Sequence, residues 1–190
     1  MRRALALALV LLPTTALAGD RKEVAQRADC VITVGDRAED GTDLIIAECA
    51  WPVASSAVIA AVKNVSAHDD YLSSVKESTS LGGDRYLQIH EASGIADRQI
   101  TLRYTNETLA DGGFKTSWTR DQAQEPLREG VVDCPRDDGW WEVHPDGDGS
   151  KVTYGLRYDA GGKVPSWLVR SFQKGGIADI VEQMRAAAAK

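Results

Sequence analysis

The sequence predicts an α+β domain in which one long C-terminal helix lies across a bent antiparallel sheet. Three observations support this prediction. Apolar and polar residues alternate with a period of two in several segments between Tyr71 and Asp159, as in strands with one dry face. The run 145–150, Pro-Asp-Gly-Asp-Gly-Ser, is typical of a hairpin turn between two such strands. From Val164 to Ala189 the apolar period becomes helical, and Pro165 suits a first helical turn.

The first residues have the features of a secretory signal peptide. Arg2 and Arg3 precede an apolar run from Ala4 to Leu12, and Ala-Leu-Ala at 16–18 ends the segment, so we predict cleavage after Ala18. The apolar run is shorter than the about 20 residues that a membrane-spanning helix needs, which makes a retained anchor the less favoured alternative. The remaining 172 of 190 residues are predicted to form one domain, 19–190, in the periplasm or secreted.

The charge balance excludes nucleic acid as a partner. The chain has 22 basic and 28 acidic residues, and loss of Arg2 and Arg3 leaves 20 against 28, a net charge of −8. Phosphate binding depends on clustered Lys and Arg, which such a surface lacks. In an exported domain, acidity serves solubility more often than one particular partner.

Two of the three cysteines are predicted to form a disulfide. Cys30 begins one strand-like segment and Cys49 ends the next, with the turn-like run 36–41 between them. A turn centred on that run places both thiols on one face with apolar residues only. The register pairs Val34 with Ile45, Ile32 with Ala47, and Cys30 with Cys49. We therefore predict a Cys30–Cys49 disulfide in an oxidising compartment and an unpaired Cys134, with two reduced structural cysteines as the alternative.

The middle of the chain predicts one short helix followed by a series of strands. Residues 54–63 are small and apolar, which indicates a helix with Ser55 or Ser56 as its cap. Residues 64–71 fit a helical turn or a loop equally well. We predict strands at 72–78, 85–91, 97–106, 113–120, 140–145 and 152–159, with 122–136 as a loop or an irregular short strand.

Three motifs add to this order of elements. Ala96-Asp97-Arg98 opens a strand, residues 139–145 follow a Gly-x-Trp-x-apolar-x-Pro pattern, and residues 158–170 place Gly-Gly, Pro and Trp on a strand-to-helix junction. Together they resemble the START (StAR-related lipid-transfer) domains of the helix-grip superfamily, which also includes polyketide-cyclase-like proteins. The resemblance covers about Ala28 to Arg185.

This resemblance implies the helix-grip fold, in which a curved antiparallel sheet is wrapped around a long C-terminal helix. It also implies an elongated apolar cavity that holds one lipid or sterol-like molecule. Such domains often have a helix before the first strand, and here only residues 20–28 are available for a truncated one. The alternation selects the residues that would line the cavity: Ile100, Leu102, Tyr104, Thr116, Trp118, Trp141, Val143, Tyr154 and Leu156 from the sheet, with Trp167, Leu168 and Phe172 from the helix.

We expect a binding protein rather than an enzyme. Apolar binding in a dry cavity requires no catalytic group, because burial alone contributes about 25 cal/mol per Å². His68, His90 and His144 lack the spacing of a metal site, so we predict no metal, no cofactor and no catalytic residue. The expected partner is a lipid or another apolar small molecule, bound by a monomer that contacts a membrane surface only transiently.

Several alternatives stay open in the sequence. Arg103, Glu142 and His90 are candidates for selecting the ligand, although a charged strand residue more often lies on the wet face. The acidic pairs 69–70 and 137–138 are interpreted as solvated turn residues. A cyclase or hydrolase on the same scaffold would place a carboxylate or imidazole with a shifted pKa in the cavity. A third possibility is an envelope interaction protein whose cavity is filled.

Overall fold

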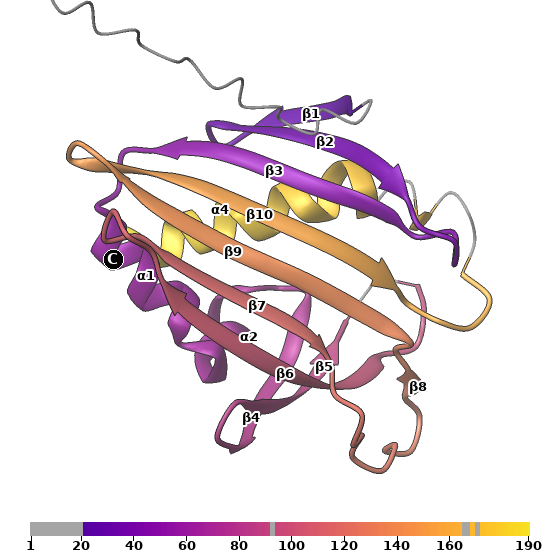
Figure 1. Ribbon diagram of the computed structural model, residues 1–190. Coiled ribbons are helices and arrows are strands. Elements are labelled where there is room, and N and C mark those ends of the chain that lie inside the picture. The colour runs from indigo at the N-terminus through magenta and orange to yellow at the C-terminus, as the bar shows by residue number, and fades with distance from the viewer. Residues whose placement is uncertain (1–20, 92–93, 165–167, 170–171) are drawn as a thin grey trace, which may run out of the picture.

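A computed structural model describes residues 21–91, 94–164, 168–169 and 172–190. The chain forms one large curved sheet, with helices packed against its concave face (Figure 1). This arrangement confirms the predicted helix-grip architecture. The elements are β1 (Lys22–Arg27), β2 (Cys30–Arg37), β3 (Asp43–Trp51), α1 (Ser55–Lys63), the 3₁₀ turn η1 (Val65–Ala67), α2 (His68–Tyr71), β4 (Val75–Gly82), β5 (Arg85–His90), β6 (Arg98–Thr108), β7 (Phe114–Arg120), β8 (Val132–Asp133), β9 (Arg136–Asp146), β10 (Gly149–Asp159), the π-helical turn η2 (Phe172–Gly176) and α4 (Ile177–Ala188).

The sheet places the first three strands of the described residues next to the last strand. Its strand order is β1-β2-β3-β10-β9-β7-β6-β5-β4, and all of these strands pair antiparallel, while short β8 runs parallel to β6. Strand β3 therefore lies next to β10, with Cys49 opposite Val152. The hairpin formed by β2 and β3 thus shares its concave face with the hairpin formed by β9 and β10.

The predicted register of the hairpin formed by β2 and β3 is confirmed. Val34 pairs with Ile45, Ile32 with Ala47, and Cys30 with Cys49. The two cysteines form a disulfide, and Cys134 is unpaired and buried.

The segment before this hairpin is a strand and not the expected truncated helix. Strand β1 pairs antiparallel with β2, with Arg27 opposite Cys30. Six residues are too few for a helix that is stable on its own, whereas the free edge of β2 offers backbone partners. The two-residue turn between them, Ala28-Asp29, has φ of 55° and 59°, as a type I′ hairpin turn requires.

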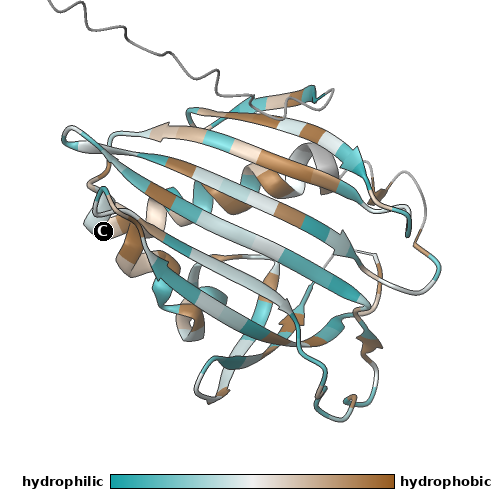
Figure 2. Cartoon of the chain, in the orientation of Figure 1, coloured by the Kyte–Doolittle hydropathy of each residue, from teal (hydrophilic) through white to brown (hydrophobic). Residues whose placement is uncertain are grey.

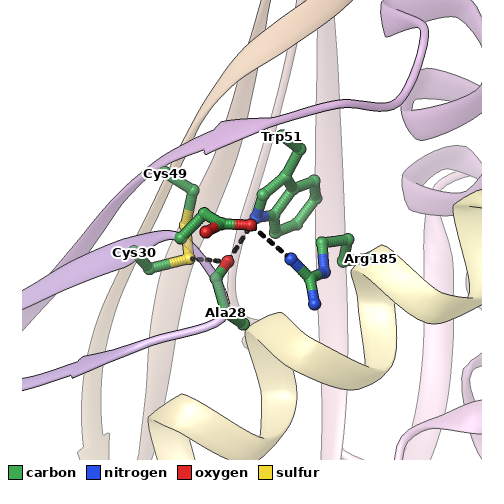
Figure 3. The surroundings of a disulfide bond; sticks show 6 residues. Ala28, Cys30, Cys49, Trp51 and Arg185 are labelled. Carbon is green, nitrogen blue, oxygen red and sulfur yellow. Dashed lines mark hydrogen bonds and ion pairs between the residues drawn. A yellow bond between two sulfur atoms is a disulfide. The ribbon is translucent and has the colours of Figure 1, made fainter.

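Side chains from other elements hold this turn in place (Figure 3). The indole Nε1 of Trp51 donates to the carbonyl of Ala28 at 3.2 Å, and Arg185 of α4 pairs with Asp29 at 2.6 Å. Arg27 adds ion pairs to Asp179 at 2.7 Å and Glu182 at 2.6 Å on the same helix. We call Arg27, Ala28 and Asp29, with these partners, the hairpin clasp.

The helices differ from prediction at their ends. Helix α1 is present as expected, but its N-cap is Ala54, which has no capping side chain, and neither Ser55 nor Ser56 takes that role. The predicted C-terminal helix is present as α4, preceded by η2, which contains the Gly175-Gly176 pair that interrupts the pattern.

The core lies between the concave face and the helices. Alternating hydropathy along the strands is visible in Figure 2, and the apolar residues of the inward set are buried. Helix α4 contributes a buried stripe of Ile177, Ile180, Val181 and Met184.

No helix in the described part of the chain is long and apolar enough to cross a membrane.

Candidate functional site

The nine sheet residues predicted to line a cavity share the concave face, and all are buried. Pairing across strands aligns them, with Tyr104 opposite Trp118, Thr116 opposite Trp141, and Trp141 opposite Tyr154. Their exposed fractions run from 0% for Ile100, Leu102 and Val143 to 7% for Trp118, with Tyr104, Thr116, Trp141, Tyr154 and Leu156 between these values. Contact with a ligand stays a prediction for all of them.

The three predicted helical residues are placed less completely. Leu168 is half-buried. The ring of Phe172 lies 5.5 Å from the ring of Tyr158 on β10, so it packs against the concave face. Trp167 lies outside the described residues.

Aromatic rings form a continuous row across this face. Tyr86 contacts Tyr104 at 5.3 Å between ring centroids, Tyr104 contacts Trp118 at 5.7 Å, and Trp118 contacts Tyr154 at 6.1 Å. Trp141 closes the row against Tyr154 at 4.3 Å. Rings at these separations contribute packing beyond their buried area. The row crosses β5, β6, β7, β10 and β9, and so provides a broad apolar wall.

A carboxyl group lies beside Trp118, the central ring of this row, where the sequence suggested solvated turn residues. Asp137 on β9 is 5% exposed, and its Oδ1 accepts a hydrogen bond of 2.7 Å from Trp118 Nε1. Burial raises the pKa of Asp137 from 3.8 to about 7. The interpretation of residues 137–138 as a turn is therefore wrong for Asp137. Asp138 faces the other side and pairs with Arg136 at 2.7 Å.

Glycine at position 139 makes the Asp137 contact possible. A Cβ at Gly139 would lie 2.4 Å from the Trp118 ring, so any side chain there would displace the indole. Gly139 is opposite Trp118 in the sheet and is two residues from Asp137, on the same face. The glycine of the Gly-x-Trp motif thus allows the indole to reach the carboxyl group.

A second polar group, His90, lies largely buried at the end of β5 on the same face. Its Nδ1 is 3.3 Å from the Tyr158 hydroxyl, and its Nε2 is 3.0 Å from Gln88 Oε1. Gln88 Nε2 in turn donates to Ser78 Oγ at 3.1 Å, and Ser78 donates to the carbonyl of Val65 at 2.7 Å. Burial lowers the pKa of His90 from 6.5 to about 4, so the imidazole is neutral at physiological pH.

We call Gln88, His90, Asp137 and Tyr158 the interior polar cluster. His90 Nε2 lies 3.7 Å from Asp137 Oδ2. The side chains of His90 and Asp137 keep 12% and 8% of their surface accessible, although both pKa shifts arise chiefly from burial. A small molecule can therefore reach both side chains.

Arg98, from the Ala-Asp-Arg motif, is buried beside the cluster and supports the loops around it. Its guanidinium donates to the carbonyls of Ala96, Ala160 at 2.9 Å and Gly161 at 3.4 Å. No ion-pair partner for Arg98 is found among the residues that the structure describes. Two of the motifs singled out in the sequence, 96–98 and the beginning of 158–170, therefore contact each other through this side chain.

The other two candidates for ligand selection lie on the convex face. Arg103 pairs with Asp84 at 2.9 Å, and Glu142 pairs with Lys115 at 2.8 Å. Each thus follows the alternation of its strand to the wet side. Of the three candidates, His90 alone points to the interior.

Cys134 is unsuited to nucleophilic chemistry. Burial raises the pKa of its thiol to about 12, and its Sγ donates to the carbonyl of Asp159 at 3.2 Å. The reactive form of cysteine is the thiolate, which such a site disfavours. Within the described ranges, no three His, Cys, Asp or Glu residues are grouped as metal ligands.

No protein-family model matches the sequence. A segment of 106 residues, 55% of the chain, is 30% identical to an uncharacterized protein of Pseudomonas aeruginosa. This segment covers 52% of that protein, so the chain spans about half the length of the curated relative it matches.

Solved structures resemble the whole domain. A STAR-related lipid transfer protein from Xanthomonas axonopodis superposes with a TM-score of 0.80 at 21% identity, covering 90% of this chain and 99% of that chain. Human StAR-related lipid transfer protein 5 gives 0.81 at 14% identity, with 92% and 88% covered. The chain therefore has the helix-grip fold of START domains.

Proposed function

We propose that the protein binds a lipid or another apolar small molecule between the concave face of its sheet and the C-terminal helix. The observation that carries this proposal is the aromatic and apolar wall beside the interior polar cluster, in which Asp137 and His90 retain accessible surface. The fold neighbours named above are lipid transfer proteins, which supports the same ligand class.

Burial of apolar ligand surface can supply enough free energy for binding, so no catalytic group is required. A ligand that buries about 400 Å² of apolar surface gains roughly 10 kcal/mol at 25 cal/mol per Å². Association losses of about 4 kcal/mol leave about 6 kcal/mol, which corresponds to a dissociation constant of tens of micromolar. The wall would provide affinity, and the polar cluster would orient the ligand.

We further propose that the domain 19–190 acts outside the cytoplasm, as a monomer that contacts membranes only transiently. The Cys30–Cys49 disulfide supports a non-reducing compartment, and the pattern of residues 1–18 supports export. N-terminal sequencing of the protein from a secreting bacterial host is expected to begin at Gly19. A cytoplasmic product that keeps Met1 would contradict the export proposal.

The binding proposal is tested by mass spectrometry of the organic extract of purified protein. We expect one class of apolar molecule at about one per chain. Leu156→Trp, which fills the concave face, should remove it, whereas Thr153→Trp on the opposite face of β10 should not. Protein that yields no apolar molecule, and that takes up none from vesicles of mixed lipids, would overturn the proposal.

An enzyme on the same scaffold is the second candidate, and Asp137 is the observation that favours it. A carboxyl group whose pKa is about 7 is matched to general acid or base work at neutral pH, and neutral His90 lies within 3.7 Å. If the enzyme reading holds, Asp137→Asn should still bind the extracted molecule but leave it unchanged over hours in which wild type converts it. A molecule that wild type returns with its mass unaltered favours the carrier.

A further inference from the structure

Hydrogen-bond directions in the interior polar cluster can be assigned from one end. Ser78 donates to the carbonyl of Val65, so its oxygen accepts from Gln88 Nε2. Gln88 therefore presents Oε1 to His90, and His90 Nε2 must carry the hydrogen. Nδ1 of neutral His90 is then an acceptor, and the Tyr158 hydroxyl donates to it. The hydrogen bonds therefore run in one order: Tyr158 donates to His90, and His90 and Gln88 each donate to the next side chain, ending at Ser78.

Asp137 is not part of this series of hydrogen bonds, and only one of its two carboxyl oxygens has a hydrogen-bond donor within the protein. Oδ1 accepts from Trp118 Nε1 at 2.7 Å. Oδ2 is 3.7 Å from His90 Nε2, whose hydrogen is already directed to Gln88. No other hydrogen bond to Oδ2 is formed by the residues that the structure describes. The Asp137 side chain keeps 8% of its surface accessible, so a partner from outside the protein can reach this oxygen and complete its hydrogen bonding.

On the basis of the proposed ligand binding, we propose that Asp137 Oδ2 is the hydrogen-bond partner of a hydroxyl group at the polar end of an otherwise apolar ligand. A hydroxyl can both donate and accept, so it pairs with this carboxyl group whether the proton is present or absent. Trp118 and Gly139 then act as positioning residues, since the indole that fits against Gly139 fixes the orientation of the carboxyl group.

Charged head groups fit this position less well. A phosphate or carboxylate would meet the like charge of ionised Asp137 and would have to lose its hydration in the interior. An ammonium group would be attracted to ionised Asp137, but it would lose its hydration in the interior, where the acceptor nitrogen of His90, Nδ1, is already used by Tyr158. A neutral hydroxyl avoids both costs.

The test is a competition between probes that share one alkyl chain and differ only at the head. Delipidated protein is equilibrated with equimolar hexadecane, hexadecanol, palmitate and hexadecyltrimethylammonium, and the complexes are quantified by native mass spectrometry. We expect hexadecanol to exceed hexadecane by about tenfold or more, the amount that one buried hydrogen bond supplies. Asp137→Leu should reduce that ratio to about one and leave hexadecane binding unchanged. Asp138→Leu, the outward neighbour, should keep the ratio of wild type.

The outcomes separate this inference from the proposed function. Equal binding of hexadecane and hexadecanol by wild type, or preference for palmitate or the ammonium probe, overturns the hydroxyl assignment and keeps apolar binding. Binding of none of the four probes overturns both. The wild-type ratio needs no variant, so misfolding of Asp137→Leu would not remove the test.

Discussion

The two ends of the concave face are built differently. The end formed by β1, β2, β3 and α4 is apolar inside, with Ile32 and Val181 fully buried, and it is fastened by the Cys30–Cys49 disulfide and the hairpin clasp. The end formed by β5, β6 and parts of β9 and β10 buries Asp137 and Arg98 and largely buries His90, which is neutral and lies 3.7 Å from Asp137. The first end stabilises the fold. Buried polar groups oppose stability, so their presence at the second end points to a role in binding.

Of the substitutions that test this comparison, Asp137→Asn is expected to change the free energy of unfolding the most. The folded pKa of Asp137 lies above its ordinary 3.8, at about 7, so the unfolded chain loses its proton first and stability falls as pH rises between these values. The full loss above pH 7 is about 4 kcal/mol by linkage. The Asn variant should therefore be the more stable protein at pH 8, with the difference vanishing near pH 4, as measured by urea unfolding.

Asp138→Asn provides the matched control, since its carboxylate is half-exposed and paired with Arg136. If the Asp137→Asn protein is less stable than wild type at pH 8, the folded protein must stabilise the charged carboxylate of Asp137 enough to offset the cost of its burial.

His90→Gln should show the opposite pH dependence, of slightly smaller size. The folded pKa of His90 is about 4, below its ordinary 6.5, so its contribution to stability is complete above pH 6.5 and is lost as pH falls toward 4. The loss amounts to about 3 kcal/mol. Relative to wild type, the Gln variant should gain stability on acidification from pH 6.5 to 4. In wild type, the His90 and Asp137 contributions largely cancel in that window. Parallel pH curves for wild type and His90→Gln would show that His90 is hydrated in the folded protein.

Replacing both Cys30 and Cys49 by Ser tests how much the disulfide stabilises the end formed by β1, β2, β3 and α4. Closing a loop of this sequence separation, 19 residues, restricts the unfolded chain and contributes about 3 kcal/mol. We expect the free energy of unfolding to fall by that amount at every pH, while the pH profile set by Asp137 stays unchanged. Wild type treated with a reducing agent should reproduce the loss. A change in the profile would mean that the two ends are coupled.

Arg27→Ala should have the smallest effect. Its ion pairs with Asp179 and Glu182 are half-exposed, and such pairs contribute at most about 1 kcal/mol. Hydrogen exchange of the α4 amides is the sensitive measurement, because the helix loses two contacts with the clasp. Arg128→Ala, which removes a comparably exposed pair with Glu77 away from α4, should leave α4 exchange unchanged. Equal exchange in both variants would show that the apolar stripe alone fixes the helix.

The sequence was sufficient to predict those features that depend on the spacing of residues within one segment. The hairpin register followed from the position of the turn between Cys30 and Cys49, and the inward set from Ile100 to Leu156 followed from alternation within each strand. Asp137 was misassigned because two adjacent acidic residues resemble a turn, although β9 alternation through Trp141 and Gly139 extends to it.

Contacts across the sheet could not be predicted in this way. Alternation assigns a residue to a face but does not show which side chains meet there. The chain from Tyr158 through His90 to Gln88 joins strands that are distant in sequence, and the carbonyls that Arg98 holds belong to two separate loops. Strand β1 was missed because its stability comes from the edge of β2 and not from its own composition.

The turn Ala28-Asp29 has a consequence for the order of assembly. Two consecutive left-handed residues that are not glycine oppose closure of the hairpin by about 1 kcal/mol each. The contacts that offset this cost come from Trp51, beyond the second cysteine, and from Arg185, five residues before the C-terminus. Closure of the turn between β1 and β2 is therefore favoured further once α4 has packed against the sheet and Arg185 can pair with Asp29.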